Sequence, residues 1–182
     1  FPSFLDSTNF GKVKVGSMSN KSFKILNKGN DTLKIKKIYV IKKDTNDFKI
    51  LSQLLPVNIL KGDSFTWGIN FISKAIGFKS TFVYLESLDN QDSLYYYSIL
   101  AESIKPIIQL KGNQKLIQNF DITPSFSDST DFGKVSLSFK RVNTFEIVNK
   151  GTDSLSINSI YVSSLDSTEF NVSNLMFPKV LY

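Results

Sequence analysis

The chain has 182 residues, of which 41% are hydrophobic and 13% aromatic, which is enough apolar material to build folded cores. It contains neither cysteine nor histidine, so disulfides, thiolate metal sites and histidine acid–base catalysis are excluded. The net charge of +6 comes almost wholly from lysine, and Arg141 is the single arginine. Because nucleic-acid readers depend on arginine and no stretch of ~20 apolar residues occurs, we expect neither nucleic-acid binding nor membrane insertion.

Short segments of alternating apolar and polar residues run through the first hundred positions, and each predicts a half-buried strand. These segments are 13–15, 23–27, 33–40, 48–50, 65–71, 81–86 and 94–101. The alternation changes parity near Lys36 and Lys37, which predicts a β-bulge. Trp67 lies in the clearest strand and is expected in the core. No segment has a helical stripe of useful length, so the sequence predicts an antiparallel sandwich.

Three consecutive tyrosines, Tyr95 to Tyr97, lie in the last of these segments. In a strand Tyr96 faces opposite to its two neighbours. We expect one face to join the core and the other to make cross-strand pairs. Stacking on a carbohydrate is the alternative, because exposed tyrosines make adaptable contacts.

A self-match dominates the sequence: residues 124–172 align without a gap on residues 2–50 at a constant offset of 122, with 23 of 49 pairs identical. Such a match is the signature of a repeated folding unit. We therefore expect an all-β chain of tandem immunoglobulin-like antiparallel sandwiches, the second incomplete. The expected parts are a first sandwich over 1–103, a partly packed connector over 104–123, and the N-terminal part of a second sandwich over 124–182.

The second copy contains no counterpart of the strands predicted in residues 64–101. An inner face left open over several hundred Å2 forfeits on the order of 10 kcal/mol, at ~25 cal/mol per Å2, which matches the net stability of most domains. We therefore expect the remaining domains of the same parent chain, or a strand-donating partner, to complete it.

The ordered pattern Phe-Gly-Lys-Val, Phe-x-Ile-x-Asn-x-Gly, Leu-x-Ile-x-x-Ile and Phe-x-Ile resembles the choice-of-anchor D repeats of bacterial surface proteins. Those repeats are relatives of the Hydin-type ASH domain and of the PapD and major sperm protein folds. The matching residues of the first copy are Phe10, Gly11, Val13, Phe23, Ile25, Asn27, Gly29, Leu33, Ile35, Ile38, Phe48 and Ile50. The resemblance implies the sandwich fold and an extracellular, cell-surface location.

An Asp-Ser/Thr pattern recurs six times, and turn formation explains it, because aspartate and serine bend and cap chains. The pattern is also similar to the O-glycosylation sites of exported Bacteroidetes proteins. The candidate acceptors are Ser7, Thr32, Ser93, Ser129, Ser154 and Ser167. No loop has the aspartate spacing of a calcium site, and no phosphate-binding glycine loop or nucleophile elbow occurs. We expect no catalytic residue, cofactor or metal.

These features favour a non-enzymatic structural or adhesive spacer of an exported bacterial cell-surface protein, delivered by type IX secretion. Its partners would be cell-surface or secretion-machinery proteins. One alternative is an intracellular scaffold of the ciliary or centrosomal kind that binds cytoskeletal partners. The other alternative is a set of accessory domains of a larger secreted enzyme.

Overall fold

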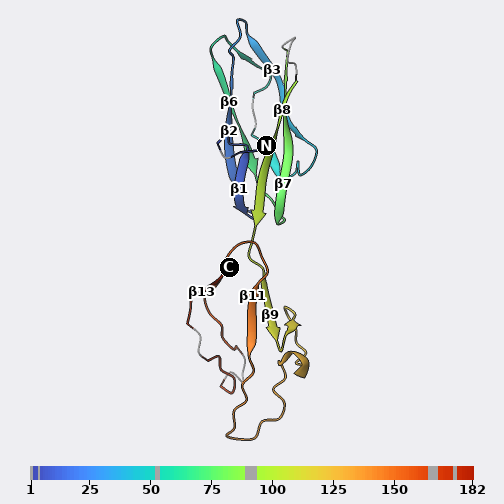
Figure 1. The fold of residues 1–182 in the computed structure, drawn as a ribbon, viewed down its shortest axis with the longest axis vertical. Coiled ribbons are helices and arrows are strands. Elements are labelled where there is room, and N and C mark those ends of the chain that lie inside the picture. The colour runs from blue at the N-terminus through green and yellow to red at the C-terminus, as the bar shows by residue number, and fades with distance from the viewer. Residues whose placement is uncertain (1, 4, 52–53, 89–93, 164–167, 174–175) are drawn as a thin grey trace. The chain divides into compact units, whose positions relative to one another are not determined.

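The computed structural model describes residues 2–3, 5–51, 54–88, 94–163, 168–173 and 176–182 (Figure 1). The chain divides into two compact units, Phe1–Ile104 and Lys105–Tyr182. Within the described residues, no helix is long and apolar enough to cross a membrane.

The first unit is a sandwich of two sheets (Figure 1). Its strands are β1 (Asn9–Lys14), β2 (Ser19–Leu26), β3 (Leu33–Ile41), β4 (Phe48–Ile50), β5 (Val57–Ile59), β6 (Ser64–Phe71), β7 (Gly77–Ser87) and β8 (Leu94–Ile104). One sheet has the order β1-β8-β7-β3-β5 and the other β2-β6-β4. Only the β1–β8 pair is parallel among these described pairings. The predicted all-β sandwich is confirmed.

The core lies between these two sheets and is built from the inward face of each alternating strand. Phe48, Phe71 and Ile69 are at most 1% exposed, and Phe48 and Phe71 pack with ring centroids 4.8 Å apart. Trp67 is 2% exposed and stacks on Phe23, the residue opposite it on β2. The prediction that Trp67 belongs to the core is confirmed.

The parity break in β3 is a β-bulge, as predicted. The register of β3 against β7 shifts between Ile35 and Lys37. As a result, Ile35 before the bulge and Ile38 after it are both buried in the same core, at 3% and 6% exposed.

Among its described residues, the second unit has five short strands and a 3-10 turn. These are β9 (Ile108–Gly112), β10 (Lys115–Ile117), η1 (Phe126–Asp128), β11 (Phe145–Asn149), β12 (Leu155–Ile157) and β13 (Lys179–Leu181). They form one sheet with the order β10-β9-β11 and another of β12 and β13.

The segment 104–123 differs from the connector expected from the sequence. Its first residue, Ile104, ends β8 in the first unit, and residues 108–117 supply β9 and β10 to the second unit. The reason is that residues 108–112 supply hydrogen-bond partners to the backbone of β11. The two strands pair along the whole length of β11, from Phe145 opposite Gly112 to Asn149 opposite Ile108. Buried backbone groups require such partners.

Candidate functional site

The Asn-x-Gly turn that closes β2 is held by one buried amide side chain. Asn27 is 5% exposed. Its Nδ2 donates to the carbonyl oxygens of Asp31 (2.7 Å) and Ile59 (2.9 Å), and its Oδ1 accepts from the Gly29 N–H (2.9 Å). This side chain therefore ties together the turn, β2 and β5.

The second copy reproduces this arrangement at the same offset. Asn149 Nδ2 donates to Asp153 (2.7 Å) and Leu181 (3.2 Å), and its Oδ1 accepts from the Gly151 N–H (3.0 Å). The strand pair that each turn supports is also the same, since Leu33 faces Ile59 in β3–β5 and Leu155 faces Leu181 in β12–β13. The two copies thus share a frame that does not depend on β6 to β8.

Core residues of the second copy lie open where their counterparts are covered. Val13 is 8% exposed but Val135 44%, and Phe48 is 1% exposed but Phe170 42%. Phe170 still meets Phe132 edge to face at 5.4 Å, as Phe48 meets Phe10 at 5.6 Å in the first copy. The second copy therefore repeats this ring contact of the first, but among the described residues no sheet covers it as the first copy's core is covered.

One edge of β11 is paired with β9 and the other is not. Backbone hydrogen bonds show which N–H groups lie on each edge. In β2 the Asn27 N–H donates to Asp63 (3.0 Å), so the odd-numbered N–H groups of β2 face β6. In β11 the Lys150 N–H donates to Ile107 (2.7 Å), so the even-numbered N–H groups face β9.

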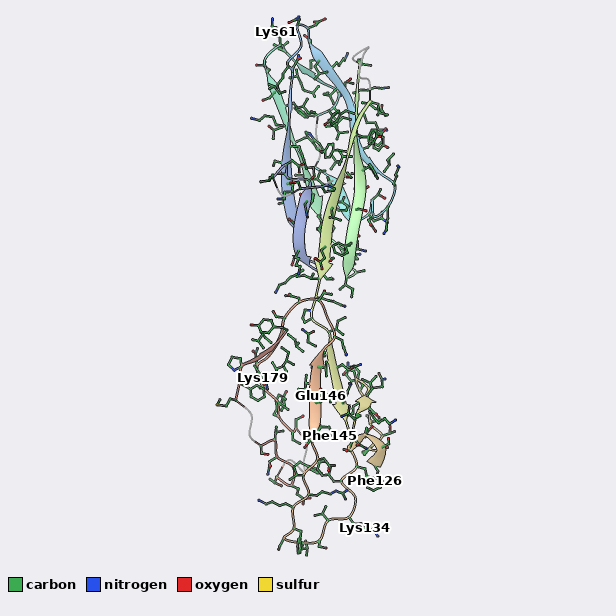
Figure 2. All side chains as sticks on the ribbon, in the orientation of Figure 1. Lys61, Phe126, Lys134, Phe145, Glu146 and Lys179 are labelled. Atoms are coloured by element: carbon green, nitrogen blue, oxygen red, sulfur yellow. The ribbon has the colours of Figure 1, made fainter. Side chains whose placement is uncertain are left out.

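Because the offset of 122 is even, β9 occupies the edge of β11 opposite to the one that corresponds to β6. We call the other side the open edge of β11; it carries the N–H groups of Phe145, Ile147 and Asn149. Within the described part of the chain no strand pairs with it. Figure 2 labels Phe145 and Glu146 on this strand.

A row of tyrosines crosses the outer face of the five-stranded sheet. Tyr39, Tyr84 and Tyr96 face one another on β3, β7 and β8. Their rings stack with centroids 5.7 Å and 5.2 Å apart, and Tyr96 is 58% exposed. Lys37 Nζ lies 4.8 Å from the centroid of the Tyr39 ring.

The neighbour Tyr97 faces the opposite way and packs on Phe23, as the alternation predicts. Burial raises the pKa of Tyr97, with the nearby Tyr95 and Asp6 adding to the shift. Its hydroxyl finds no hydrogen-bond partner among the described residues. On the outer face, the hydrogen bond that Tyr39 donates to Glu86 Oε1 (2.8 Å) raises the pKa of Tyr39.

The candidate glycosylation residues lie in turns wherever the structure describes them. Ser7 and Ser129 both have φ 65° in equivalent Asp-Ser-Thr turns. Thr32 and Ser154 are exposed, each next to an aspartate whose Oδ1 accepts its N–H (2.6 Å and 2.9 Å). Ser93 and Ser167 lie outside the described residues. The structure thus shows the turns but does not bring the four described candidates, Ser7, Thr32, Ser129 and Ser154, together into a common site.

In the Asp-Ser-Thr turns it is the threonine that holds the structure. Thr8 donates its hydroxyl and its N–H to Asp6 Oδ1 (2.6 Å and 3.0 Å), and these bonds lower the pKa of Asp6. Thr130 makes the same bonds to Asp128 (2.6 Å and 3.0 Å). The side chain of the middle serine, Ser7 or Ser129, takes no part in these hydrogen bonds.

The sequence did not predict which strands pair at each edge. Periodicity indicates which face a residue occupies but not which neighbour its backbone reaches. The apolar residues of 107–110 were the available signal for β9. Among the described residues, no group of three or more acidic side chains is placed to hold a metal ion.

The two-sheet core and the shared Asn-x-Gly frame define an immunoglobulin-like β-sandwich module. Residues 3–99 match the HYDIN/CFA65/VesB-like, Ig-like domain family, and the chain belongs to this family. The Ig-like part of the resemblance seen in the sequence is thereby confirmed. The comparison with curated proteins gave no match.

Three solved structures that are similar to part of this chain are distant from it in sequence. The ASH/PapD-like domain of human CEP192 is 15% identical, with 53% of this chain and 80% of that chain covered and a TM-score of 0.41. The secreted serine protease VesC from Vibrio cholerae is 12% identical, with 54% and 22% covered and a TM-score of 0.44. SSP-19 of Caenorhabditis elegans, an MSP-domain-like protein, is 13% identical, with 53% and 96% covered and a TM-score of 0.38.

Proposed function

We propose that this chain is a non-enzymatic structural and adhesive spacer of an exported bacterial cell-surface protein of the choice-of-anchor D type, delivered by type IX secretion. The observation that carries the proposal is the second copy itself. It repeats the frame of the first, yet leaves residues such as Phe170 at 42% exposure. A module with a half-covered core binds additional strands that cover its apolar residues, and it does not act as an isolated unit.

The open edge of β11 is where such a strand joins. Its Phe145, Ile147 and Asn149 correspond to Phe23, Ile25 and Asn27, which pair with β6. An added antiparallel strand would form main-chain bonds along this edge and cover the apolar residues beside it. The strand comes from the remaining domains of the same parent chain or from a strand-donating partner, and cell-surface or secretion-machinery proteins are the candidates for that partner.

Amide hydrogen exchange of the full chain tests this joint. A synthetic peptide with the sequence of Asp63–Ile72 supplies β6 in trans at about 1 mM, a concentration comparable to that of a tethered segment. We expect it to slow exchange at Phe145, Ile147 and Asn149 by about 30-fold or more. The variant Ile147→Pro should abolish the effect, because it removes an N–H of the open edge but no bond to β9.

The variant Ile147→Ala is the matched control and should keep the response. If the peptide leaves all three amides unchanged, the second unit does not accept a strand at this edge, and the spacer proposal loses its basis.

Location and modification are tested on native material. Protease treatment of intact cells should remove an exported surface protein and spare an intracellular scaffold. Intact-mass measurement should show hexose increments if the exposed Thr32 and Ser154 are O-glycosylated. An unmodified mass together with protection from the protease would favour the ciliary- or centrosomal-type scaffold. A catalytic domain elsewhere in the parent chain would favour the role of accessory domains of a larger secreted enzyme.

A further inference from the structure

The first unit also has an unpaired strand edge, on the opposite side of β2 from β6. The even-numbered N–H groups of β2, and that of the middle residue of the Asn-x-Gly turn, point there because the odd-numbered ones face β6. We call this the open edge of β2 and define it by the N–H groups of Lys24, Leu26 and Lys28. All three residues are exposed, and β2 is the terminal strand of its sheet in the described structure.

In the second unit β9 fills the equivalent edge, and Gly151 shows how closely. A Cβ at Gly151 would lie 2.5 Å from the Ile107 nitrogen and 2.7 Å from the Pro106 carbonyl carbon. Real Cβ atoms do not approach other atoms so closely. Gly151 is therefore required because the segment before β9 lies directly against it.

At the counterpart Gly29, no described backbone lies so close. A Cβ there would meet only the Asn27 Oδ1 at 3.2 Å among the described atoms. Gly29 is not among the residues with positive φ, so its backbone does not need glycine either. Besides this tight contact with the Asn27 side chain, a backbone lying alongside would give a second reason for glycine at this position, as it does at Gly151.

A second position gives the same indication at the far end of the edge. Asp128 is 7% exposed, and its carbonyl lies so close to Gly112 of β9 that a side chain at Gly112 would collide with it. The counterpart Asp6 makes the same turn with Thr8 but is exposed. The surface that β9 covers in the second unit is therefore present and uncovered in the first.

We propose that the open edge of β2 binds an extended strand from another module of the same kind, antiparallel to β2, with the chemistry of Lys105–Gly112. The occupant follows from the β9 register carried over by 122 positions. Lys28, Leu26 and Lys24 would bond to residues equivalent to Ile107, Gln109 and Lys111. The proline equivalent to Pro106 would lie on Gly29, and a glycine would lie on the Asp6 carbonyl.

This inference deepens the proposed function and rests on it, because it makes successive modules share strands. In the second unit β9 begins four residues after the first unit ends. A spacer joined in this way is held by backbone hydrogen bonds as well as by the connecting chain.

The test uses hydrogen exchange of the full chain with a synthetic peptide of the sequence Lys105–Ile117 at about 1 mM. We expect exchange at Lys24, Leu26 and Lys28 to slow by about 30-fold or more. The Gly29→Ala variant should lose this protection, and its melting temperature reports separately on the contact of the new Cβ with Asn27 Oδ1, 3.2 Å away. A peptide carrying Gly112→Val should protect far less, because its side chain would meet the Asp6 carbonyl.

Lys24→Pro and Lys24→Ala make a second, matched pair on the edge itself. The proline removes an outward N–H that β6 does not use and should abolish protection, whereas the alanine should retain it. Unchanged exchange at all three amides would overturn the inference, as would equal protection in Gly29→Ala. Since the β6 peptide reports on β11 and this peptide on β2, failure here is distinguishable from failure of the proposed function.

Discussion

The buried amide of Asn27 should be the most sensitive polar position of the first unit. Replacement by alanine removes three hydrogen bonds, of 2.7, 2.9 and 2.9 Å, and leaves the Ile59 carbonyl and the Gly29 N–H without their partner. At about 1 kcal/mol for each bond, Asn27→Ala should lower the free energy of unfolding by about 3 kcal/mol. For a unit of this size the melting temperature should fall by roughly 12–24 °C.

Urea unfolding followed by tryptophan fluorescence measures this loss in the first unit alone, because Trp67 is the single tryptophan of the chain. Asn20→Ala is the control, since Asn20 lies on the same strand with an exposed side chain and should change stability by less than about 0.5 kcal/mol. Equal stabilities for the two variants would refute the view that this side chain fastens β2 to β5.

Three further predictions concern the core, the outer face and β9. The pKa of Tyr97 in the folded state lies above the unfolded value of about 10, so Tyr97 keeps its proton to higher pH in the folded state. Its contribution to the free energy of unfolding should therefore be fully present below about pH 10 and should fall above that pH by up to ~1.4 kcal/mol per pH unit. Tyr97→Phe should weaken that fall without loss at pH 7, and identical pH profiles by urea unfolding would contradict it. Tyr84→Ala removes two ring stacks and should cost about 1–2 kcal/mol in the same assay; no loss would mean that the row is not stabilising. Gly151→Ala should displace the segment before β9 and expose the Lys150 amide to rapid exchange, whereas Gly29→Ala should displace no backbone, because its Cβ would meet only the Asn27 Oδ1 at 3.2 Å among the described atoms. Retained protection of Lys150 would contradict the close approach.

Several features of the fold could be predicted from the sequence because they depend on local alternation. The inward placement of Trp67 and Ile69 follows from the period of two along β6, and the bulge in β3 follows from a parity change. The opposite orientations of Tyr96 and Tyr97 are of the same kind. In each case neighbouring residues of one strand fix which face a side chain occupies.

The strand neighbours could not be predicted in this way. Both edges of a strand carry the same backbone groups, so nothing in the alternation of Phe145 to Asn149 says that β9 reaches one edge and leaves the other open. The role of residues 108–112 as a strand of the second unit was missed for this reason. The sequence predicted the outward orientation of Tyr96 but not its stacking in a row, because Tyr39 and Tyr84 come from strands far apart in the chain.

The amino-acid sequence by itself determined the repeat, the in-and-out alternation of each strand and the Asn-x-Gly turn, because all three depend on residues close together along the chain. Only the tertiary structure decided which edges are paired, and hence that Val13 is covered while Val135 is open. Hydrogen bonds between strands form with whichever backbone the fold brings alongside, and side-chain pattern alone does not specify that backbone.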